Sequence, residues 1–380
     1  MTNFKEITVK EIKLKNCTRY YISIDLNNAD TDLISSLYLK VISEIRVKKL
    51  QVVFEKIFGK IEYKRKFYNM REALLKNEAV QAFPSTFIEG FPVTNSCLSS
   101  ITFFCVSQNV DIEYITEDNL YVGCVINQPE ERALYLNNFS VDEKSLTSIN
   151  HNVYDTIFSN IKRKILSSNF KPTDLVRNWI YLNHIYSNYV EFNQARNNFF
   201  TENNIQYTAN SNDLPASTCI EGRSSENSIV SIDCLLVDKS LSEPTIQRVY
   251  SNLQNEPDGV TYENKPSFAR AVALKYQDRI ELQISGTASI DNHGITVYEN
   301  DPKKQIRTTL LSVLHLLEQF GMGFSDFCLS TVFLKSADYY QIYKEVLEEL
   351  HISEFSVSFV QTNVCRNNLL CEIDGVCIKK

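Results

Sequence analysis

The sequence lacks the features that mark nucleic-acid-binding, membrane-spanning and secreted proteins. Its 39 lysines and arginines are outnumbered by 46 aspartates and glutamates, and no long basic run is present that would bind nucleic acid or an anionic membrane. No apolar run reaches the length of a membrane span. Residues 1–15 mix charges with single apolar residues, so we expect no signal peptide and a cytoplasmic protein.

Spacings typical of metal and nucleotide sites are also missing. The ten cysteines and five histidines are scattered, without a CxxC pair or an HxxxH spacing. We therefore expect no metal site and interpret the cysteines as reduced, mostly buried thiols. The chain has neither a Walker loop nor a Rossmann fingerprint, so we expect no nucleotide cofactor. With 380 residues, 43% of them hydrophobic, the chain can form two or three cores.

The chain does contain one pattern of elements three times. In the last third, apolar residues at helical spacing over 306–317 predict a helix that ends at Gly321-Met322-Gly323. A strand, a second helix and two closing strands are then predicted over Cys328–Leu334, Tyr339–Leu350, Ser356–Val360 and Leu369–Ile378. The middle third predicts the same order, with helices over 153–165 and 189–200 and strands over 175–182 and 228–237. The first third repeats it more divergently, with helices over 33–45 and 67–77 around a strand over 48–58.

Short strings support this repetition. DLVRNWIYL aligns with DFCLSTVFL, which places Asp174 over Asp326. FPSTFIEG, from Phe83 to Gly90, matches LPASTCIEG, from Leu214 to Gly222, apart from one inserted residue. Both strings precede an alternating strand, so they hold the same place in their units.

Each unit also opens with a pair of strands, so its order is ββαβαββ. This order predicts an α+β fold with helices on one face of each sheet. We expect units over residues 1–110, 111–245 and 255–380, with a loop or linker over 240–265. Three unrelated α+β domains that share a common pattern are the alternative.

The C-terminal unit resembles the YjgF-like family, which has a helix, a short glycine-containing turn, a strand and a second helix in this order. PASTCIE in the middle unit is similar to the closing strand of that family. YjgF-like proteins form trimers with clefts between subunits. The resemblance therefore implies that three units in one chain build a pseudo-trimer, and that the protein is a monomer.

The whole chain, best from about residue 120 onward, is similar to the chorismatases. The resemblance depends on the order and spacing of RNWIYLNHI, YVEFNQAR, PAST, SGTASI and VCRNNLLCEIDG. It departs from the family at Cys219, where a glycine is usual, and beyond His293, where Thr296, Val297 and Tyr298 stand in place of an expected histidine. The resemblance implies that the substrate is chorismate and that its cleavage releases pyruvate.

Glu372 is the candidate catalytic acid. Release of pyruvate requires protonation of an enol-ether methylene, so the site needs a carboxylic acid that stays protonated near neutral pH. Glu372 lies between Cys371 and Ile373 in an apolar strand, where an unpaired carboxylate would be costly. Strand alternation could instead point it to solvent. The resemblance places it on the catalytic glutamate of the family.

Five residues are candidates for substrate binding, four polar ones and Gly286. Strand alternation places Arg177 and Tyr181 on one face with Trp179, and an arginine fork suits a carboxylate. Arg177 could equally pair with an acidic neighbour. Arg196 on the next helix is a second candidate, and the Thr218 hydroxyl could hold the other carboxylate of the substrate.

Gly286 and Cys365 resemble the pair found in the 3-hydroxybenzoate-forming branch of chorismatases. A glycine leaves room for the substrate ring and a thiol is a poor anchor for water, which disfavours attack by external water. Cys365 could otherwise be an ordinary buried cysteine.

Other activities remain open. Hydrolysis of chorismate would give a dihydroxycyclohexadienoate and pyruvate. An imine or enamine deaminase of the YjgF type would use an arginine on the penultimate strand, and residues 355–360 carry none. A non-enzymatic small-molecule-binding protein is the third alternative, mainly for the first unit.

Overall fold

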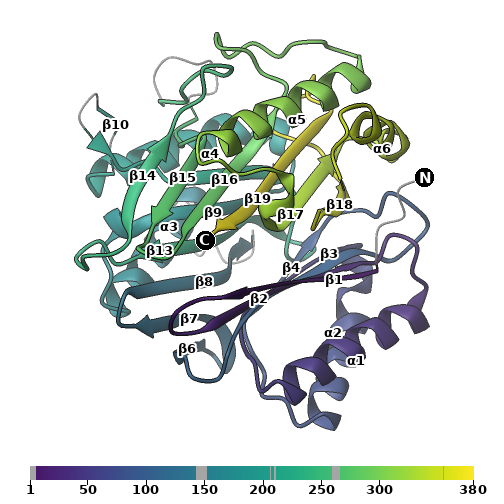
Figure 1. Cartoon of the computed structure of the whole chain (residues 1–380), viewed down its shortest axis with the longest axis vertical. Coiled ribbons are helices and arrows are strands. Elements are labelled where there is room, and N and C mark those ends of the chain that lie inside the picture. The colour runs from purple at the N-terminus through teal and green to yellow at the C-terminus, as the bar shows by residue number, and fades with distance from the viewer. Residues whose placement is uncertain (1–5, 143–151, 206, 209–210, 259–265, 354) are drawn as a thin grey trace.

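The computed structural model describes residues 6–142, 152–205, 207–208, 211–258, 266–353 and 355–380, which form three large sheets with pairs of helices around them (Figure 1). The first sheet and its helices comprise β1 (Ile7–Lys13), β2 (Thr18–Asp25), α1 (Thr31–Val47), β3 (Gln51–Gly59), the 3-10 turn η1 (Ile61–Tyr63), α2 (Lys64–Asn77), β4 (Ser85–Glu89) and β5 (Leu98–Val106).

The second sheet follows along the chain. It comprises β6 (Asp111–Glu117), β7 (Leu120–Gln128), β8 (Glu131–Asp142), α3 (Val153–Ser167), η3 (Pro172–Asp174), β9 (Leu175–Leu182), α4 (Ile185–Glu202), β12 (Ala216–Glu221) and β13 (Ser228–Val237). A small hairpin of β10 (Tyr207–Thr208) and β11 (Ser211–Asn212) precedes β12.

The third sheet contains the remaining elements. These are β14 (Thr245–Val249), β15 (Ala271–Lys275), β16 (Ile280–Ala288), α5 (Pro302–Glu318), η4 (Phe324–Asp326), β17 (Phe327–Leu334), α6 (Tyr339–Glu349), β18 (Ser358–Gln361) and β19 (Cys371–Lys379).

The three sheets share one topology, which confirms the predicted ββαβαββ units. Their strand orders are β1-β2-β5-β3-β4, β7-β8-β13-β9-β12 and β15-β16-β19-β17-β18, with β6 and β14 added at the edges of the second and third sheets. Asp174 and Asp326, which the sequence aligned, accept hydrogen bonds from the backbone of Lys171 and Gly323 at 2.8 and 2.9 Å. The repeated aspartate therefore fixes the same turn before β9 and β17.

One prediction was wrong. The segment expected to be a loop or linker contains strand β14, which pairs along its length with β15. Its sequence is polar because an edge strand pairs on one side only, so Thr245 and Gln247 remain exposed while Val249 is buried. Residues 259–265 of this segment lie outside the described part of the chain.

Each helix pair covers the outer face of its own sheet, and the three inner faces meet. Buried apolar residues of α1 and α2, of α3 and α4, and of α5 and α6 join three separate cores, each with one sheet. Two further cores are built from residues of all three units, without any from these helices. Figure 1 shows α1 and α2 at one edge of the molecule and α5 and α6 at another.

The units pack cyclically around a pseudo-threefold axis. Strand β4 packs against β8, β12 against β16, and β18 against β2, so each unit contacts the next and the third closes on the first. Phe58, Tyr181 and Phe333 hold equivalent positions in β3, β9 and β17, and the ring of Phe58 lies 5.9 and 6.0 Å from the other two. Elsewhere in the interface between the units, Arg19 of the first unit forms buried ion pairs with Glu131 of the second and Glu281 of the third.

The sequence Ile-Glu-Gly occurs at residues 88–90 and 220–222, and both copies lie where two units are in contact. The backbone N–H of Glu89 donates to the carbonyl of Arg223 at 2.9 Å, and Arg223 pairs with the Glu89 carboxylate through Nε and Nη2 at 2.7 and 2.9 Å. A Cβ on Gly222 would lie 2.7 Å from Ile88 of the first unit. Glycine is therefore needed there for the close approach of two units, which explains the match without a shared binding site.

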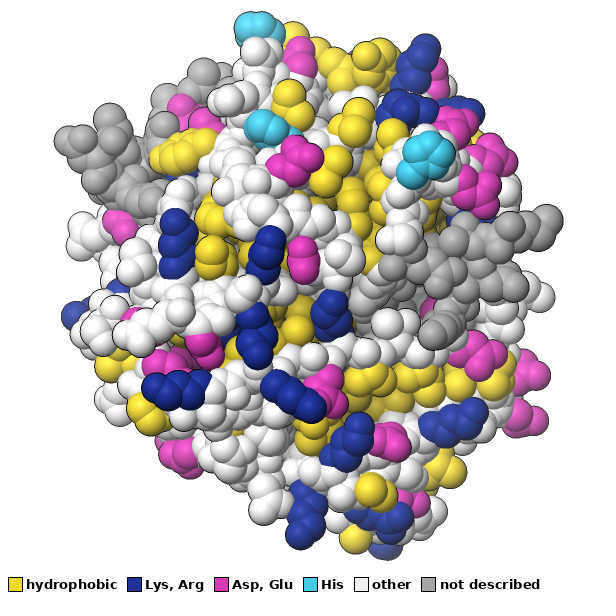
Figure 2. Space-filling model, viewed as in Figure 1, with side chains coloured by type: hydrophobic (Ala, Val, Ile, Leu, Met, Phe, Trp, Pro, Cys, Tyr) yellow, Lys and Arg dark blue, Asp and Glu magenta, His cyan; other side chains and the backbone are white. Residues whose placement is uncertain are grey.

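Basic and acidic side chains are interspersed over the face of the molecule shown in Figure 2. Among the described residues, no helix combines the length and the apolar character needed to cross a membrane.

Candidate active site

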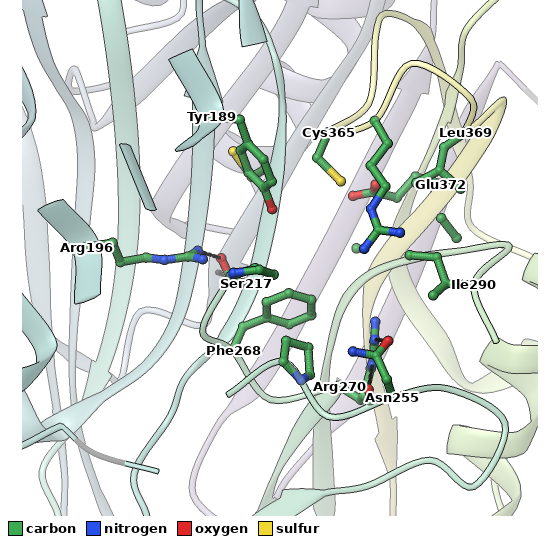
Figure 3. Close-up of a pocket in the computed structure, with 16 residues that line it drawn as sticks. Tyr189, Arg196, Ser217, Asn255, Phe268, Arg270, Ile290, Cys365, Leu369 and Glu372 are labelled. Atoms are coloured by element: carbon green, nitrogen blue, oxygen red, sulfur yellow. Dashed lines mark hydrogen bonds between the residues drawn. The ribbon is translucent and has the colours of Figure 1, made fainter. Parts of the chain in front are cut away.

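The candidate active site is a pocket between the second and third units. The edge strand β12 approaches the third sheet here, with the N–H of Ala269 donating to the carbonyl of Pro215 and the N–H of Ser217 donating to Oγ of Ser285, both at 2.8 Å. Residues of both units line the pocket (Figure 3): Tyr189, Arg196, Ser217 and Cys219 from the second, and Asn255, Pro257, Pro266, Phe268, Arg270, Gly286, Ala288, Ile290, Cys365, Arg366, Leu369 and Glu372 from the segment after it.

Glu372 is buried in this pocket, with only 4% of its surface exposed. The alternative that strand alternation points it to solvent is therefore wrong. Burial and, to a smaller extent, the negative charge of Asp374 raise its pKa to about 8, against the lowering effects of Arg177 and Arg270. Such a carboxyl is mostly protonated at neutral pH and can donate a proton.

Gly286 makes space for this carboxyl. A Cβ at residue 286 would lie 1.9 Å from Oε1 of Glu372 and 3.3 Å from the methyl group of Thr218. Any other residue at this position would displace the Glu372 side chain.

Two arginines approach the pocket from different walls. Arg196 on α4 is buried, with its Nη2 donating to Oδ1 of Asn193 at 2.7 Å and its Nη1 to Oγ of Ser217 at 3.4 Å. Arg270 is also buried and donates to the backbone and side-chain oxygens of Asn255 at 2.9 and 2.8 Å. In Figure 3 Arg196 lies on the wall opposite Glu372, whereas Arg270 lies below the carboxyl. Two fixed cations on separate walls can hold an anion with two carboxylates.

Cys365 lies beside Glu372, and its sulfur points into the same space (Figure 3). Burial raises the pKa of this thiol to about 12, so it remains neutral at physiological pH. The hydroxyl of Tyr189 faces the pocket from the opposite unit.

The pocket continues into a larger outer cavity of about 1070 Å³. Tyr189, Cys365 and Arg366 line both spaces, so they form the boundary between them. Arg366 donates from Nη1 to the carbonyl of Gly294 at 2.6 Å, which attaches the loop before β19 to the loop around residue 294.

Three predicted binding residues lie behind the pocket and not in its lining. Arg177 donates from Nη2 to Oδ2 of Asp374 at 2.9 Å, so the alternative that it pairs with an acidic neighbour holds. The Thr218 hydroxyl donates to the same carboxylate at 2.7 Å and accepts from Arg177 at 2.6 Å. Tyr181 packs against Phe58 on the pseudo-threefold axis. Alternation selected the right face of β9, but this face points to the shared centre of the three sheets.

Sequence reasoning missed Arg270, Asn255 and Phe268 as lining residues. Arg270 directly precedes a strand that was recognised, and a buried arginine at a strand end was the available signal. Asn255 lies in the segment interpreted as a linker, where its sequence gave no indication of a site.

The position that Glu372 occupies in the third sheet is not acidic in the other two sheets. Glu372 pairs across the sheet with Phe333, and the residues that pair in the same way with Tyr181 and Phe58 are Ser231 and Ser100. The first unit therefore has no equivalent of Glu372, as the sequence indicated. Within the described residues, no three histidine, cysteine, aspartate or glutamate side chains are grouped as a metal site would require.

Comparison with known proteins agrees with this architecture. A protein-family model described as Endoribonuclease L-PSP, of the YjgF-like type, matches residues 266–379. A crystal structure of a chorismatase is 16% identical in sequence and aligns with a TM-score of 0.62 over 86% of this chain and 92% of that chain.

Smaller structures match a single unit. Yeast Mmf1 is 14% identical, with a TM-score of 0.30 over 36% of this chain and 100% of that chain. E. coli TdcF, crystallised with bound serine, is 17% identical, with a TM-score of 0.28 over 35% of this chain and 99% of that chain. This protein therefore has the fold of a chorismatase, built from repeated YjgF-like units.

Proposed function

We propose that this protein is an enzyme that cleaves chorismate into pyruvate and a cyclic carboxylic acid. The observation that carries the proposal is the buried Glu372, whose pKa is raised to about 8, in a cleft with two arginines on other walls. The shared fold with a chorismatase supports it, because the cleft lies between units of that fold.

Glu372 would act as the general acid. Chorismate carries an enol-ether side chain, and protonation of its methylene carbon produces an electron-poor carbon that a nucleophile can attack. A carboxyl with a pKa of about 8 holds the required proton at neutral pH, and an apolar wall formed by Ala288, Ile290 and Leu369 excludes water from it. The resulting Glu372 carboxylate would recover a proton from the substrate, because cleavage of chorismate into pyruvate and 3-hydroxybenzoate neither takes up nor releases a proton overall.

The two carboxylates of chorismate would bind to Arg196 and Arg270. Both guanidinium groups are oriented by asparagine partners, so little side-chain freedom is lost when they bind an anion. Arg177, Tyr181 and Thr218, which the sequence suggested for this purpose, would act indirectly because they lie behind the pocket wall.

The product we propose is 3-hydroxybenzoate. In this branch the neighbouring ring hydroxyl of the substrate loses its proton and attacks the ring carbon that carries the side chain. The C–O bond to the protonated side chain breaks, and the side chain leaves as pyruvate. Loss of a ring proton and return of a proton to the oxygen then give the aromatic product, and no external water is consumed. A neutral thiol at Cys365 is a weak hydrogen-bonding partner for water beside Glu372, which favours this outcome over hydrolysis to a dihydroxycyclohexadienoate. Gly286 supports the same branch only through the room it leaves near the carboxyl.

The test is to incubate the purified protein with chorismate, without added metal or nucleotide, and to measure pyruvate and the cyclic product by chromatography. We expect pyruvate with 3-hydroxybenzoate, and a loss of roughly 10²–10⁴ in turnover for Glu372→Gln with substrate binding retained. Glu318→Gln on α5, where the side chain is exposed, is the matched control and should retain full turnover. If the wild-type protein releases no pyruvate from chorismate, the proposal is wrong.

A further inference from the structure

Behind Glu372 lies a buried group of charges that the proposed proton transfer does not use. It contains two cations and two anions: Lys56 with Asp233 at 3.1 Å, and Arg177 with Asp374 at 2.9 Å. All four side chains are at least 90% buried, and they come from all three units. The four charges balance one another, so the group has no net charge.

Glu372 is the fifth ionisable side chain beside this balanced group. Asp374 is two residues further along β19, so it projects from the same face of the strand as Glu372. Thr218 connects the two positions, because its hydroxyl donates to Asp374 while its methyl lies close to the space between Gly286 and Glu372. Arg177, a cation that acts on both carboxyls, is paired with Asp374 through Nη2 at 2.9 Å.

We propose that Asp374, held by Arg177 and Thr218, is a positioning residue that keeps Glu372 in its protonated form. The Asp374 carboxylate pairs with Nη2 of Arg177 and so offsets the positive charge that stabilises an ionised Glu372. It also places a negative charge close to the one that Glu372 would acquire. Both effects disfavour loss of the proton from Glu372.

The other groups around Glu372 do not reverse this balance. Arg270 lowers the pKa of Glu372, but less than Asp374 raises it. The thiols of Cys219, Cys365 and Cys371 all have pKa values raised by burial, so they carry no charge in the neutral range. Residues of two units therefore influence the protonation of Glu372, since Arg177 and Thr218 belong to the second unit and Asp374 to the third.

The inference rests on the proposed function only for its catalytic consequence. Protonation of Glu372 is measured directly by infrared difference spectroscopy as a function of pH, with the carboxylic acid band assigned by its loss in Glu372→Gln. This readout needs no substrate, so it separates a failure of this inference from a failure of the proposed activity.

Two substitutions should move the titration of Glu372 in opposite directions. Asp374→Asn leaves the Thr218 hydroxyl an oxygen to donate to, frees Arg177, and should lower the titration midpoint by about one pH unit or more. Arg177→Met removes the cation and should raise the midpoint. The high-pH limb of turnover should shift in the same directions, whereas KM should change less.

Because a lone buried charge can prevent folding, the double variant Arg177→Met/Asp374→Asn is included, and its midpoint should fall between those of the wild type and Asp374→Asn. An unchanged midpoint in folded Asp374→Asn would overturn the inference. If that variant does not fold, a midpoint in the double variant at or above that of the wild type would also overturn it.

Discussion

The raised pKa of Glu372 has a measurable consequence for folding. In the unfolded chain its pKa returns close to the ordinary value of 4.5, whereas in the native protein burial raises it to about 8. The native state therefore holds the proton more tightly than the unfolded state. The contribution of protonated Glu372 to the free energy of unfolding is therefore fully present below the unfolded-state pKa. It is lost as the pH rises through the native-state pKa.

The size of this pKa shift determines how much the free energy of unfolding should change with pH. The interval between 4.5 and about 8 corresponds to ~5 kcal/mol at 1.36 kcal/mol per pH unit. Glu372→Gln removes the ionisation but retains the shape of the protonated side chain. The difference in the free energy of unfolding, Glu372→Gln minus wild type, should therefore increase by several kcal/mol between pH 4.5 and pH 8.5, and then level off.

Urea unfolding at a series of pH values measures this difference. Subtraction of the wild-type curve removes the contribution of all other titrating groups that the two proteins share. Glu318→Gln controls for the loss of an exposed carboxylate. A difference for Glu372→Gln that stays constant from pH 4.5 to pH 8.5 would refute the conclusion that Glu372 is protonated in the native protein.

Three other predictions follow from the pocket and the unit packing. Gly286→Ala should force the Glu372 carboxyl to move by about 1 Å, because the new Cβ would lie 1.9 Å from Oε1; we expect a folded protein with roughly 10²-fold lower turnover, and unchanged turnover would contradict this contact. Cys365→Ala and Cys365→Val should change the ratio of 3-hydroxybenzoate to dihydroxycyclohexadienoate, as measured by chromatography, while pyruvate release persists. An unchanged ratio would show that Cys365 is an ordinary buried cysteine with no effect on the product. Because the three units close on one another within one chain, sedimentation should give a monomer of 43.8 kDa, and an obligate trimer would argue against closure.

Local sequence patterns determined the units of this protein. Helical and strand periodicities depend on neighbours along the chain, so α1, β9, β13 and β17 could be predicted within a few residues. The strings around Asp174 and Asp326 and the two IEG segments identified the repeat, because each makes a contact that recurs in its unit. Strand β14 was missed, since an edge strand with exposed polar residues has the composition of a loop.

The assignment of residues to the site depended on the tertiary structure. Alternation correctly placed Arg177 and Tyr181 on one face of β9, but periodicity along one strand does not tell which other unit that face meets. Only the packing of three sheets around an axis paired Arg177 with Asp374 and left Arg196 and Arg270 at the pocket. Likewise, the sequence proposed Glu372 as the acid, whereas its burial and its raised pKa result from the close approach of β12 and β16, which are far apart in the chain.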